Sequence, residues 1–245
     1  GDKVIVTSYD LGMNTDGGFG EYIRVPADWA VKLPENLTLK EAMIYGTAGL
    51  TAGMSVLRLT ESVKPEDGNI IVSGATGGVG SMSVAILAKL GYTVTAVTGK
   101  ESEHDYLSDL GATDIISRKD IENAGNKPLL KPQFAGAIDT VGGAILENII
   151  ESIRSIGVVT CCGNVASPDL NLTVFPFILR GVSLIGIDSQ NYPMSYRIKV
   201  WEKLSQEWKP SQILNVYTEI TLDDIPEKIN LMLLGKLKGR TIIKM

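Results

Sequence analysis

A glycine-rich turn between an apolar segment and a helical pattern constrains this chain more than any other feature. The segment Ile70–Ser73 is almost entirely apolar, and the turn Gly74–Gly80 follows it directly. Apolar residues from Val79 to Leu90 then recur at the spacing of one helix face. Because glycine lacks a Cβ, the backbone can approach an anion that the N–H groups of the helix start can bind. This succession predicts the first βα turn of a dinucleotide-binding fold.

The spacing of the glycines departs from the usual pattern. In Gly-x-Gly-x-x-Gly the first glycine would fall on Ala75, while Gly77 and Gly80 occupy the second and third places. Gly74 can still supply the tight turn. Glycine-rich turns also join strands to helices in proteins that bind no nucleotide. The order of strand, turn, helix and second strand makes nucleotide binding the favoured interpretation.

Apolar segments alternate with helical patterns from residue 70 onward. Short, nearly continuous apolar runs are typical of parallel strands that are buried on both faces. The predicted strands are Ile70–Ser73, Thr93–Val97, Ile115–Ser117, Ala135–Asp139, Val158–Cys162 and Leu184–Ile187. The predicted helices begin near Gly78, run from Ser102 to Leu110, and cover Ala144–Ile156 with Gly157 as the stop. This alternation predicts an α/β fold with a Rossmann-type doubly wound parallel sheet.

The two ends of the chain differ from the middle. Thr38 and Glu41 form the pattern of a capping box, at the start of a helix that reaches about Leu59. The first residues hold β-type runs at Val4–Thr7, Glu21–Val25 and Ala30–Leu33. The last residues predict a helix at Ser195–Gln206, a β-type run at Ile213–Ile220, a helix at Asp224–Leu234 and a strand at Thr241–Lys244. We therefore predict a Rossmann domain at residues 44–211 and a β-rich lobe formed by residues 1–43 and 212–245.

The residues after the second predicted strand bear on the choice between NAD and NADP. NAD proteins carry an Asp or Glu there, which binds the ribose 2′-hydroxyl. Here the strand ends in Thr98-Gly99-Lys100, which offers a hydroxyl and an ammonium group to a 2′-phosphate. Arg118 follows the neighbouring third strand and can bind the same phosphate. The sequence predicts NADP. One alternative is that both cations are solvated surface residues, and another is that a shift of the turn by one residue brings Glu101 to the place of the acid.

Composition and charge exclude several classes of protein. A net charge of −5 leaves no excess of Lys and Arg for a phosphate backbone, so nucleic acid is not expected as a partner. The most apolar stretch, Leu170–Ile187, is interrupted by polar residues, and no membrane span is expected. The only cysteines, Cys161 and Cys162, are adjacent, which rules out a disulfide framework and favours a reduced, cytoplasmic location. The chain also starts directly on an apolar run without Met, so we expect residues to precede Gly1.

Metal and hydrolase chemistry find little support. The single histidine, His104, lies among acidic residues at the polar start of a helix and is expected at the surface. Cys161 and Cys162 would point to opposite faces of one strand, so they cannot form half of a tetrahedral metal site. A Ser-His-Asp hydrolase would also need a serine on a Gly-x-Ser-x-Gly elbow, which the sequence lacks.

Several blocks of the chain together form the pattern of one family. They are Gly18-Phe19-Gly20-Glu21-Tyr22, Val25-Pro26-Ala27, Leu33-Pro34, Gly46-Thr47-Ala48-Gly49-Leu50-Thr51-Ala52, the glycine turn and Gly239-Arg240. In these blocks the chain resembles the medium-chain dehydrogenase/reductase superfamily. Four more blocks are similar to its zinc-free, quinone-oxidoreductase-like branch, which includes acrylyl-CoA reductase. These are Thr98-Gly99-Lys100-Glu101-Ser102, Gly136-Ala137-Ile138-Asp139-Thr140-Val141-Gly142, Pro176-Phe177-Ile178-Leu179-Arg180 and Gly186-Ile187-Asp188-Ser189.

The resemblance implies a fold, a cofactor and a set of site residues. It implies a GroES-like catalytic lobe, here incomplete, a Rossmann domain, NADPH as hydride donor, no metal and a homodimer. The family tyrosine near the nicotinamide would lie before Gly1, so no catalytic residue is assigned, and the chain is expected to bind NADPH but turn over poorly. The implied cofactor contacts are Thr47, Thr76, Gly77, Gly78, Val79, Gly80, Thr98, Gly99, Lys100, Arg118, Asn164, Ile178 and Ser189. For Thr47, a role in packing or capping its helix is an equal alternative.

The expected activity is reduction of an activated C=C bond by NADPH. The small-molecule substrate implied by the resemblance is an α,β-unsaturated acyl thioester such as acryloyl-CoA. Quinone reduction with the same cofactor is one alternative, and a non-enzymatic NADP-binding protein is another. The apolar segment Leu184–Ile187 is expected to be an exposed sheet edge at which two copies pair.

Overall fold

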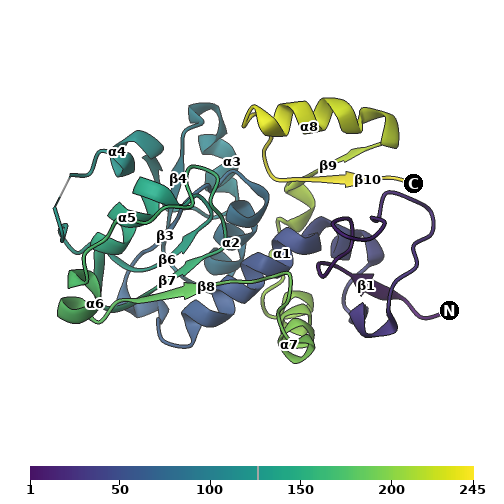
Figure 1. The fold of residues 1–245 in the computed structure, drawn as a ribbon, viewed down its shortest axis with the longest axis horizontal. Coiled ribbons are helices and arrows are strands. Elements are labelled where there is room, and N and C mark those ends of the chain that lie inside the picture. The colour runs from purple at the N-terminus through teal and green to yellow at the C-terminus, as the bar shows by residue number, and fades with distance from the viewer. Residues whose placement is uncertain (126) are drawn as a thin grey trace.

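A six-stranded parallel sheet forms the centre of the larger part of the molecule (Figure 1). The structure is a computed structural model that describes residues 1–125 and 127–245. Its strands follow the order β5, β4, β3, β6, β7, β8, so the chain leaves the central β3 to either side in turn. This is the predicted doubly wound arrangement. The strands are β3 (Ile70–Val72), β4 (Val94–Thr98), β5 (Asp114–Ser117), β6 (Phe134–Asp139), β7 (Ile153–Cys161) and β8 (Ser183–Gly186).

Helices cover both faces of this sheet, which explains its continuously apolar strands. Successive side chains of a strand point to opposite faces. Ile70 and Val72 therefore join one apolar cluster, while Ile71 joins the other. The first cluster includes residues of α1 (Leu39–Thr60), α2 (Gly78–Lys89), α3 (His104–Asp109) and α7 (Met194–Ser205). Residues of α4 (Arg118–Glu122), α5 (Gly143–Glu151) and α6 (Phe175–Arg180) pack in the second.

Two small sheets lie beside the Rossmann-type part, at the right of Figure 1. One pairs β1 (Val4–Val6) with β2 (Ala30–Lys32) in antiparallel fashion, and the other pairs β9 (Tyr217–Ile220) with β10 (Arg240–Ile243) in parallel. Helix α8 (Ile225–Leu233) connects β9 to β10. These elements come from the two ends of the chain. The exact division at residues 43/44 and 211/212 stays a prediction.

Helix α1 connects β2 of the first small sheet to β3 of the central sheet, and it contains a sharp bend. Its start is the predicted capping box, because Glu41 N donates to Thr38 Oγ1 at 3.1 Å and Thr38 N donates to a Glu41 carboxylate oxygen at 2.9 Å. Gly46 then leaves the helical conformation, with φ of 49° and ψ of −152°. Only glycine adopts such a conformation at low cost. The bend places the first turns of α1 on the side of the small sheets.

One predicted helix is wrong at its C-terminal end. The sequence predicted a helix over Ala144–Ile156, but α5 ends at Glu151 and β7 begins at Ile153. Ser152 is the C-terminal cap of the helix, and its hydroxyl donates to Asn148 O at 2.6 Å. Ile156 is 77% exposed with a φ of 66°, so it does not extend the apolar helix face. The isoleucine spacing that predicted one helix therefore covers both α5 and the start of β7, where Ile153 pairs with Phe134.

The predicted strand at Glu21–Val25 is also wrong. No strand is assigned there, and Tyr22 is 93% exposed. A strand forms only where its backbone can pair with a neighbour, and none of the described strands pairs with this segment. The β-type run predicted at Ile213–Ile220 forms only in part, because it begins as the 3₁₀ turn Ile213–Asn215 and pairs from Tyr217 onward.

Candidate functional site

The glycine turn has the geometry that an anion site requires. Gly74 has a φ of 58°, and a Cβ added to it would lie 2.3 Å from Thr140 Oγ1. It therefore supplies the tight turn that the sequence assigned to it. A Cβ on Gly80 would lie 2.3 Å from Gly74 O and 2.8 Å from Ala75 Cα, so helix α2 packs directly on the turn. No side chain caps the helix start at Gly77, which leaves its first N–H groups for a ligand.

A buried carboxylate fastens the strand ends beneath this turn. Asp139 at the end of β6 accepts a hydrogen bond from Ser73 Oγ at 2.5 Å and another from Gly142 N at 2.9 Å. Ser73 Oγ in turn accepts from Thr140 N at 2.9 Å. Burial raises the pKa of Asp139, although these hydrogen bonds favour its charged form. The network holds the ends of β3 and β6 together, so the turn between β3 and α2 has a fixed base.

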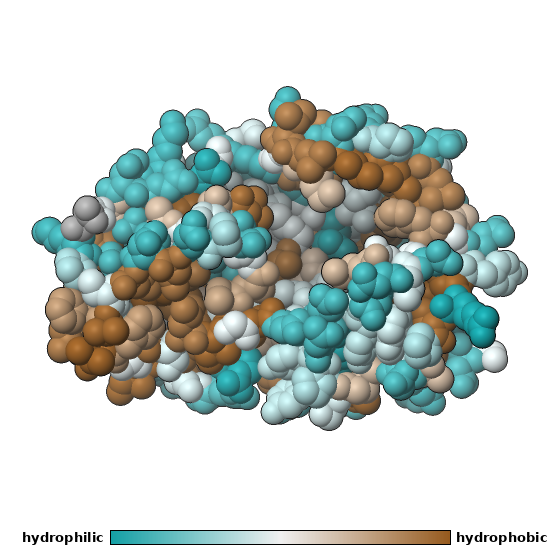
Figure 2. Space-filling view, in the orientation of Figure 1, coloured by the Kyte–Doolittle hydropathy of each residue, from teal (hydrophilic) through white to brown (hydrophobic). Residues whose placement is uncertain are grey.

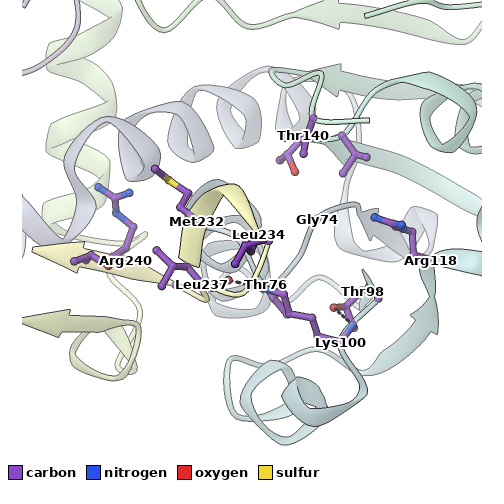
Figure 3. A pocket seen from close by; sticks show the side chains of 18 of the residues that line it. Gly74, Thr76, Thr98, Lys100, Arg118, Thr140, Met232, Leu234, Leu237 and Arg240 are labelled. Carbon is purple, nitrogen blue, oxygen red and sulfur yellow. Dashed lines mark hydrogen bonds between the residues drawn. The ribbon is translucent and has the colours of Figure 1, made fainter. Parts of the chain in front are cut away.

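A pocket of about 1260 Å³ opens over the turn and extends to helix α8 (Figures 2 and 3). It is larger than the roughly 300–1,000 Å³ typical for drug-sized ligands, as a dinucleotide needs. The predicted contacts that line it are Thr76, Gly77, Gly78, Thr98, Gly99, Lys100 and Arg118. Exposed His104, predicted at the surface, lies at its margin.

The cations predicted for a 2′-phosphate lie together at one end of this pocket. Strands β4 and β5 pair in parallel with Thr98 opposite Ser117, so Lys100 and Arg118 both follow adjacent strand ends. A Cβ on Gly99 would lie 3.8 Å from Arg118 Cβ. Arg118 is an exposed residue whose Nε lies 3.3 Å from a Glu122 carboxylate oxygen. The two cations therefore face the same region, as the topology predicted (Figure 3).

The C-terminal segment fastens onto the same end of the pocket. Lys100 Nζ donates to Leu237 O, Lys238 Nζ lies 2.6 Å from a Glu103 carboxylate oxygen, and Gly239 N donates to Thr76 O at 2.9 Å. Burial lowers the pKa of Lys100, and the charge of Lys238 acts in the same direction. This wall was not predicted, since nothing local in residues 234–239 signals a ligand site.

Arg240 also lies at the site, although it was not among the predicted cofactor contacts. Its Nε donates to Ile44 O at 3.0 Å. Cβ atoms added to Gly46 and Gly78 would lie 2.8 and 3.0 Å from its two terminal nitrogens. The guanidinium group therefore lies between the bend of α1 and the start of α2, beside the anion site, and burial lowers its pKa. The block Gly239-Arg240 was noted in the sequence only for its family resemblance.

Six predicted contacts do not line the pocket. Gly80 packs against the backbone of the glycine turn, and Val79 packs against the first apolar cluster. Thr47 is exposed, and its carbonyl accepts from Thr51 Oγ1 at 2.7 Å within α1. The other three, which follow the strands on the other side of β3, are Asn164, Ile178 and Ser189. Their roles stay predictions.

A Rossmann-type sheet, a glycine turn at a bare helix start and an elongated pocket define a dinucleotide-binding α/β protein. A family model described as zinc-binding dehydrogenase matches residues 78–206, more than half of the chain. The chain belongs to this medium-chain dehydrogenase/reductase family. Together with the relatives below, the match confirms the resemblance seen in the sequence.

The relatives belong to the branch that the sequence indicated. The chain is 40% identical to acrylyl-CoA reductase AcuI of Ruegeria pomeroyi over 244 residues, 99% of this chain and 74% of the relative. YhfP of Bacillus subtilis, which bears the name of a quinone oxidoreductase, is 48% identical over all of this chain and 75% of its own length. The crystal structure of YhfP has NAD bound and superposes with a TM-score of 0.97. The YhdH oxidoreductase of Salmonella enterica in complex with NADP also gives 0.97, at 43% identity over all of this chain and 75% of that one.

In residues 1–125 and 127–245, no cluster of three or more His, Cys, Asp and Glu side chains could hold a metal ion. Over the same residues, no helix has the length and apolar character to cross a membrane. Cys161 and Cys162 are free thiols, and burial raises the pKa of Cys162 to about 12.

Proposed function

We propose that the chain binds NADP(H) and that the protein is an NADPH-dependent reductase of activated C=C bonds. The observation that carries this proposal is the pair Lys100 and Arg118 at adjacent strand ends, beside the anion site of the glycine turn. The complex of Salmonella YhdH with NADP supports it. YhfP was crystallised with NAD, so the choice of NADP over NAD is argued from these two cations together with the NADP complex.

Each part of the site has a role in binding this cofactor. The first N–H groups of α2 and the Arg240 guanidinium bind the diphosphate, and Lys100 and Arg118 bind the 2′-phosphate. NADPH supplies the hydride. The protein would orient the nicotinamide toward the β-carbon of the substrate. Hydride addition at that carbon breaks the C=C π bond and places enolate charge on the carbonyl oxygen, and a proton must then reach the α-carbon. No residue of this chain is assigned as the proton donor.

The substrate that we propose is an α,β-unsaturated acyl thioester such as acryloyl-CoA. The name of the Ruegeria relative supports this choice, and the name of YhfP supports a quinone as the second candidate. The assay follows the oxidation of NADPH by the protein at 340 nm, with acryloyl-CoA or a simple quinone at equal subsaturating concentration. We expect the rate with acryloyl-CoA to be at least tenfold higher, a difference of about 1.4 kcal/mol in transition-state binding.

Other outcomes of this assay point to the alternatives. Fast quinone reduction beside negligible thioester turnover would replace the substrate. Binding of NADPH without its oxidation by either compound would favour a non-enzymatic NADP-binding protein. A cytoplasmic location remains a prediction from the two free cysteines.

We also propose that two copies associate through the edge of the central sheet. Strand β8 ends the sheet, so one side of its backbone is not paired with another strand of the described chain. Figure 2 shows an apolar patch over the neighbouring α6, where Ile178 and Leu179 are 67% and 62% exposed. A second copy that extends the sheet would satisfy the backbone of β8 and cover this patch.

The oligomeric state tests this association. We expect the mass from sedimentation equilibrium to be that of a dimer, and Leu179→Asp to shift it to that of a monomer because the charge would be buried in the interface. Leu233→Asp on α8, where the side chain is 78% exposed, is the matched control and should leave the dimer intact. A monomeric mass for the unchanged protein would contradict the proposal.

A further inference from the structure

Arg197 on α7 is buried and forms no direct ion pair. Burial lowers its pKa, and the more distant charge of Asp188 favours its charged form. The exposed fraction of Arg197 is 1%, and none of the ion pairs among the described residues includes it. Its Nη2 donates to Ser189 O and to Gln190 O, both at 2.7 Å, and its Nε donates to Tyr192 O at 2.9 Å. A buried cation without an anion is costly unless hydrogen bonds satisfy it. Three carbonyls of one loop accept hydrogen bonds from this guanidinium group, and Thr7 O accepts a fourth from Nη1 at 3.4 Å.

This loop lies at the end of the sheet opposite to Lys100. It follows β8, while Lys100 and Arg118 follow β4 and β5 on the other side of β3. A dinucleotide in a doubly wound fold lies across the carboxyl ends of the strands, with one half on each side of the central strand. If the 2′-phosphate lies at β4 and β5, the nicotinamide half extends toward β6, β7 and β8. The loop held by Arg197 belongs to that half.

The other side of the guanidinium group holds a strained turn from the small-sheet region. Its Cζ lies 4.4 Å from the centroid of the Tyr9 ring, and Tyr9 N donates to Gln190 O at 3.1 Å. Ser8 and Tyr9 both have positive φ, at 70° and 53°. Such conformations cost of order 1–3 kcal/mol each for non-glycine residues and persist only where surrounding contacts enforce them. Arg197 therefore joins the strained turn to the loop after β8.

We propose that Arg197 is a positioning residue for the nicotinamide half of the cofactor. It fixes the loop of residues 189–192 after β8 and attaches the Ser8–Tyr9 turn to it, so the two segments present one preorganised surface. The guanidinium group suits this task because its donors form a rigid planar fork that a lysine ammonium lacks. The inference rests on the proposed binding of NADP(H).

Two ligands separate this role from a general loss of structure. NADPH occupies both halves of the site, whereas 2′,5′-ADP carries only the adenosine half with its 2′-phosphate. We expect Arg197→Met to raise the Kd of NADPH about tenfold, because the loop must be ordered on binding, and to leave the Kd of 2′,5′-ADP within about twofold. Isothermal titration calorimetry measures both. Arg197→Lys, which keeps the charge but loses the fork, should show the same pattern and serves as the second variant if Arg197→Met does not fold.

A matched arginine provides the control. Arg154 donates to Asp67 O at 3.0 Å near the opposite, amino-terminal end of the strands. Arg154→Met should leave both affinities unchanged. Equal weakening of both ligands by Arg197→Met would show a merely structural role, and unchanged NADPH affinity would show no role; either result overturns the proposal. An unchanged chain that binds neither ligand would instead refute the proposed function, and this inference with it.

Discussion

Gly80→Ala is expected to abolish measurable NADPH binding and to destabilise the protein. The added Cβ would lie 2.3 Å from Gly74 O and 2.8 Å from Ala75 Cα, both backbone atoms that cannot move aside without opening the turn. Overpacking of this kind costs about 3 kcal/mol at its upper range. For a chain of this size, that corresponds to a fall in Tm of about 6–12 °C. The displaced turn also moves the N–H groups that bind the diphosphate, so we expect the Kd of NADPH to rise at least a hundredfold, by about 2.7 kcal/mol or more.

Gly18→Ala is the control for this change. A Cβ on Gly18 meets no atom within 4 Å, so both Tm and NADPH affinity should stay close to those of the unchanged protein. Differential scanning calorimetry and titration calorimetry measure the two quantities. If Gly80→Ala kept full affinity for NADPH, the turn would not be the diphosphate site, whatever its effect on stability.

Lys100→Ala is expected to remove most of the preference for NADPH over NADH. A charge-assisted contact to the 2′-phosphate contributes about 1.5–3 kcal/mol, so the Kd of NADPH should rise about 10- to 100-fold. The Kd of NADH should change little, since NADH carries no 2′-phosphate. Arg118→Ala should act in the same direction but less strongly, because the side chain of Arg118 is 57% exposed and screened by water.

Lys89→Ala tests whether loss of any positive charge has this effect. Lys89 lies in the last turn of α2 and does not line the pocket. Its removal should leave the ratio of the two affinities unchanged. An unchanged preference for NADPH in Lys100→Ala would show that the 2′-phosphate is bound elsewhere, and equal loss for both cofactors would show that Lys100 acts through the fold. The hydrogen bond to Leu237 O makes the second outcome a specific alternative.

The central sheet was predictable because its signals are local. Each strand is a short apolar run, and burial on both faces makes such runs continuous. The glycine turn was predictable for a similar reason, since the positive φ of Gly74 and the close contacts of Gly80 with Gly74 and Ala75 arise within a few residues. Lys100 and Arg118 could be placed side by side because parallel strands bring their carboxyl ends together.

The wrong end of the predicted helix arose because the regular spacing of the isoleucines continues from α5 into β7. Ile145, Ile149 and Ile153 lie four residues apart and match a helix face, but the last of them belongs to β7. Gly157 was interpreted as a helix stop, whereas a Cβ there would lie 2.4 Å from Ile153 Cγ2 and 2.5 Å from Ala135 O inside the sheet. The sequence around Gly157 could not reveal that it lies in a strand, because this depends on the pairing of β7 with β6.

The sequence by itself determined the fold class, the glycine turn and the position of Lys100 and Arg118 after adjacent strands. Each of these depends on residues close together in the chain or on a rule of parallel sheets. Only the tertiary structure brought Arg240 beside Gly78, Leu237 to Lys100, and Arg197 between Tyr9 and the loop after β8. These contacts join residues that are 137 to 188 positions apart in the chain, or meet a loop whose course depends on α7. No local pattern encodes such contacts, because they depend on how separate elements pack.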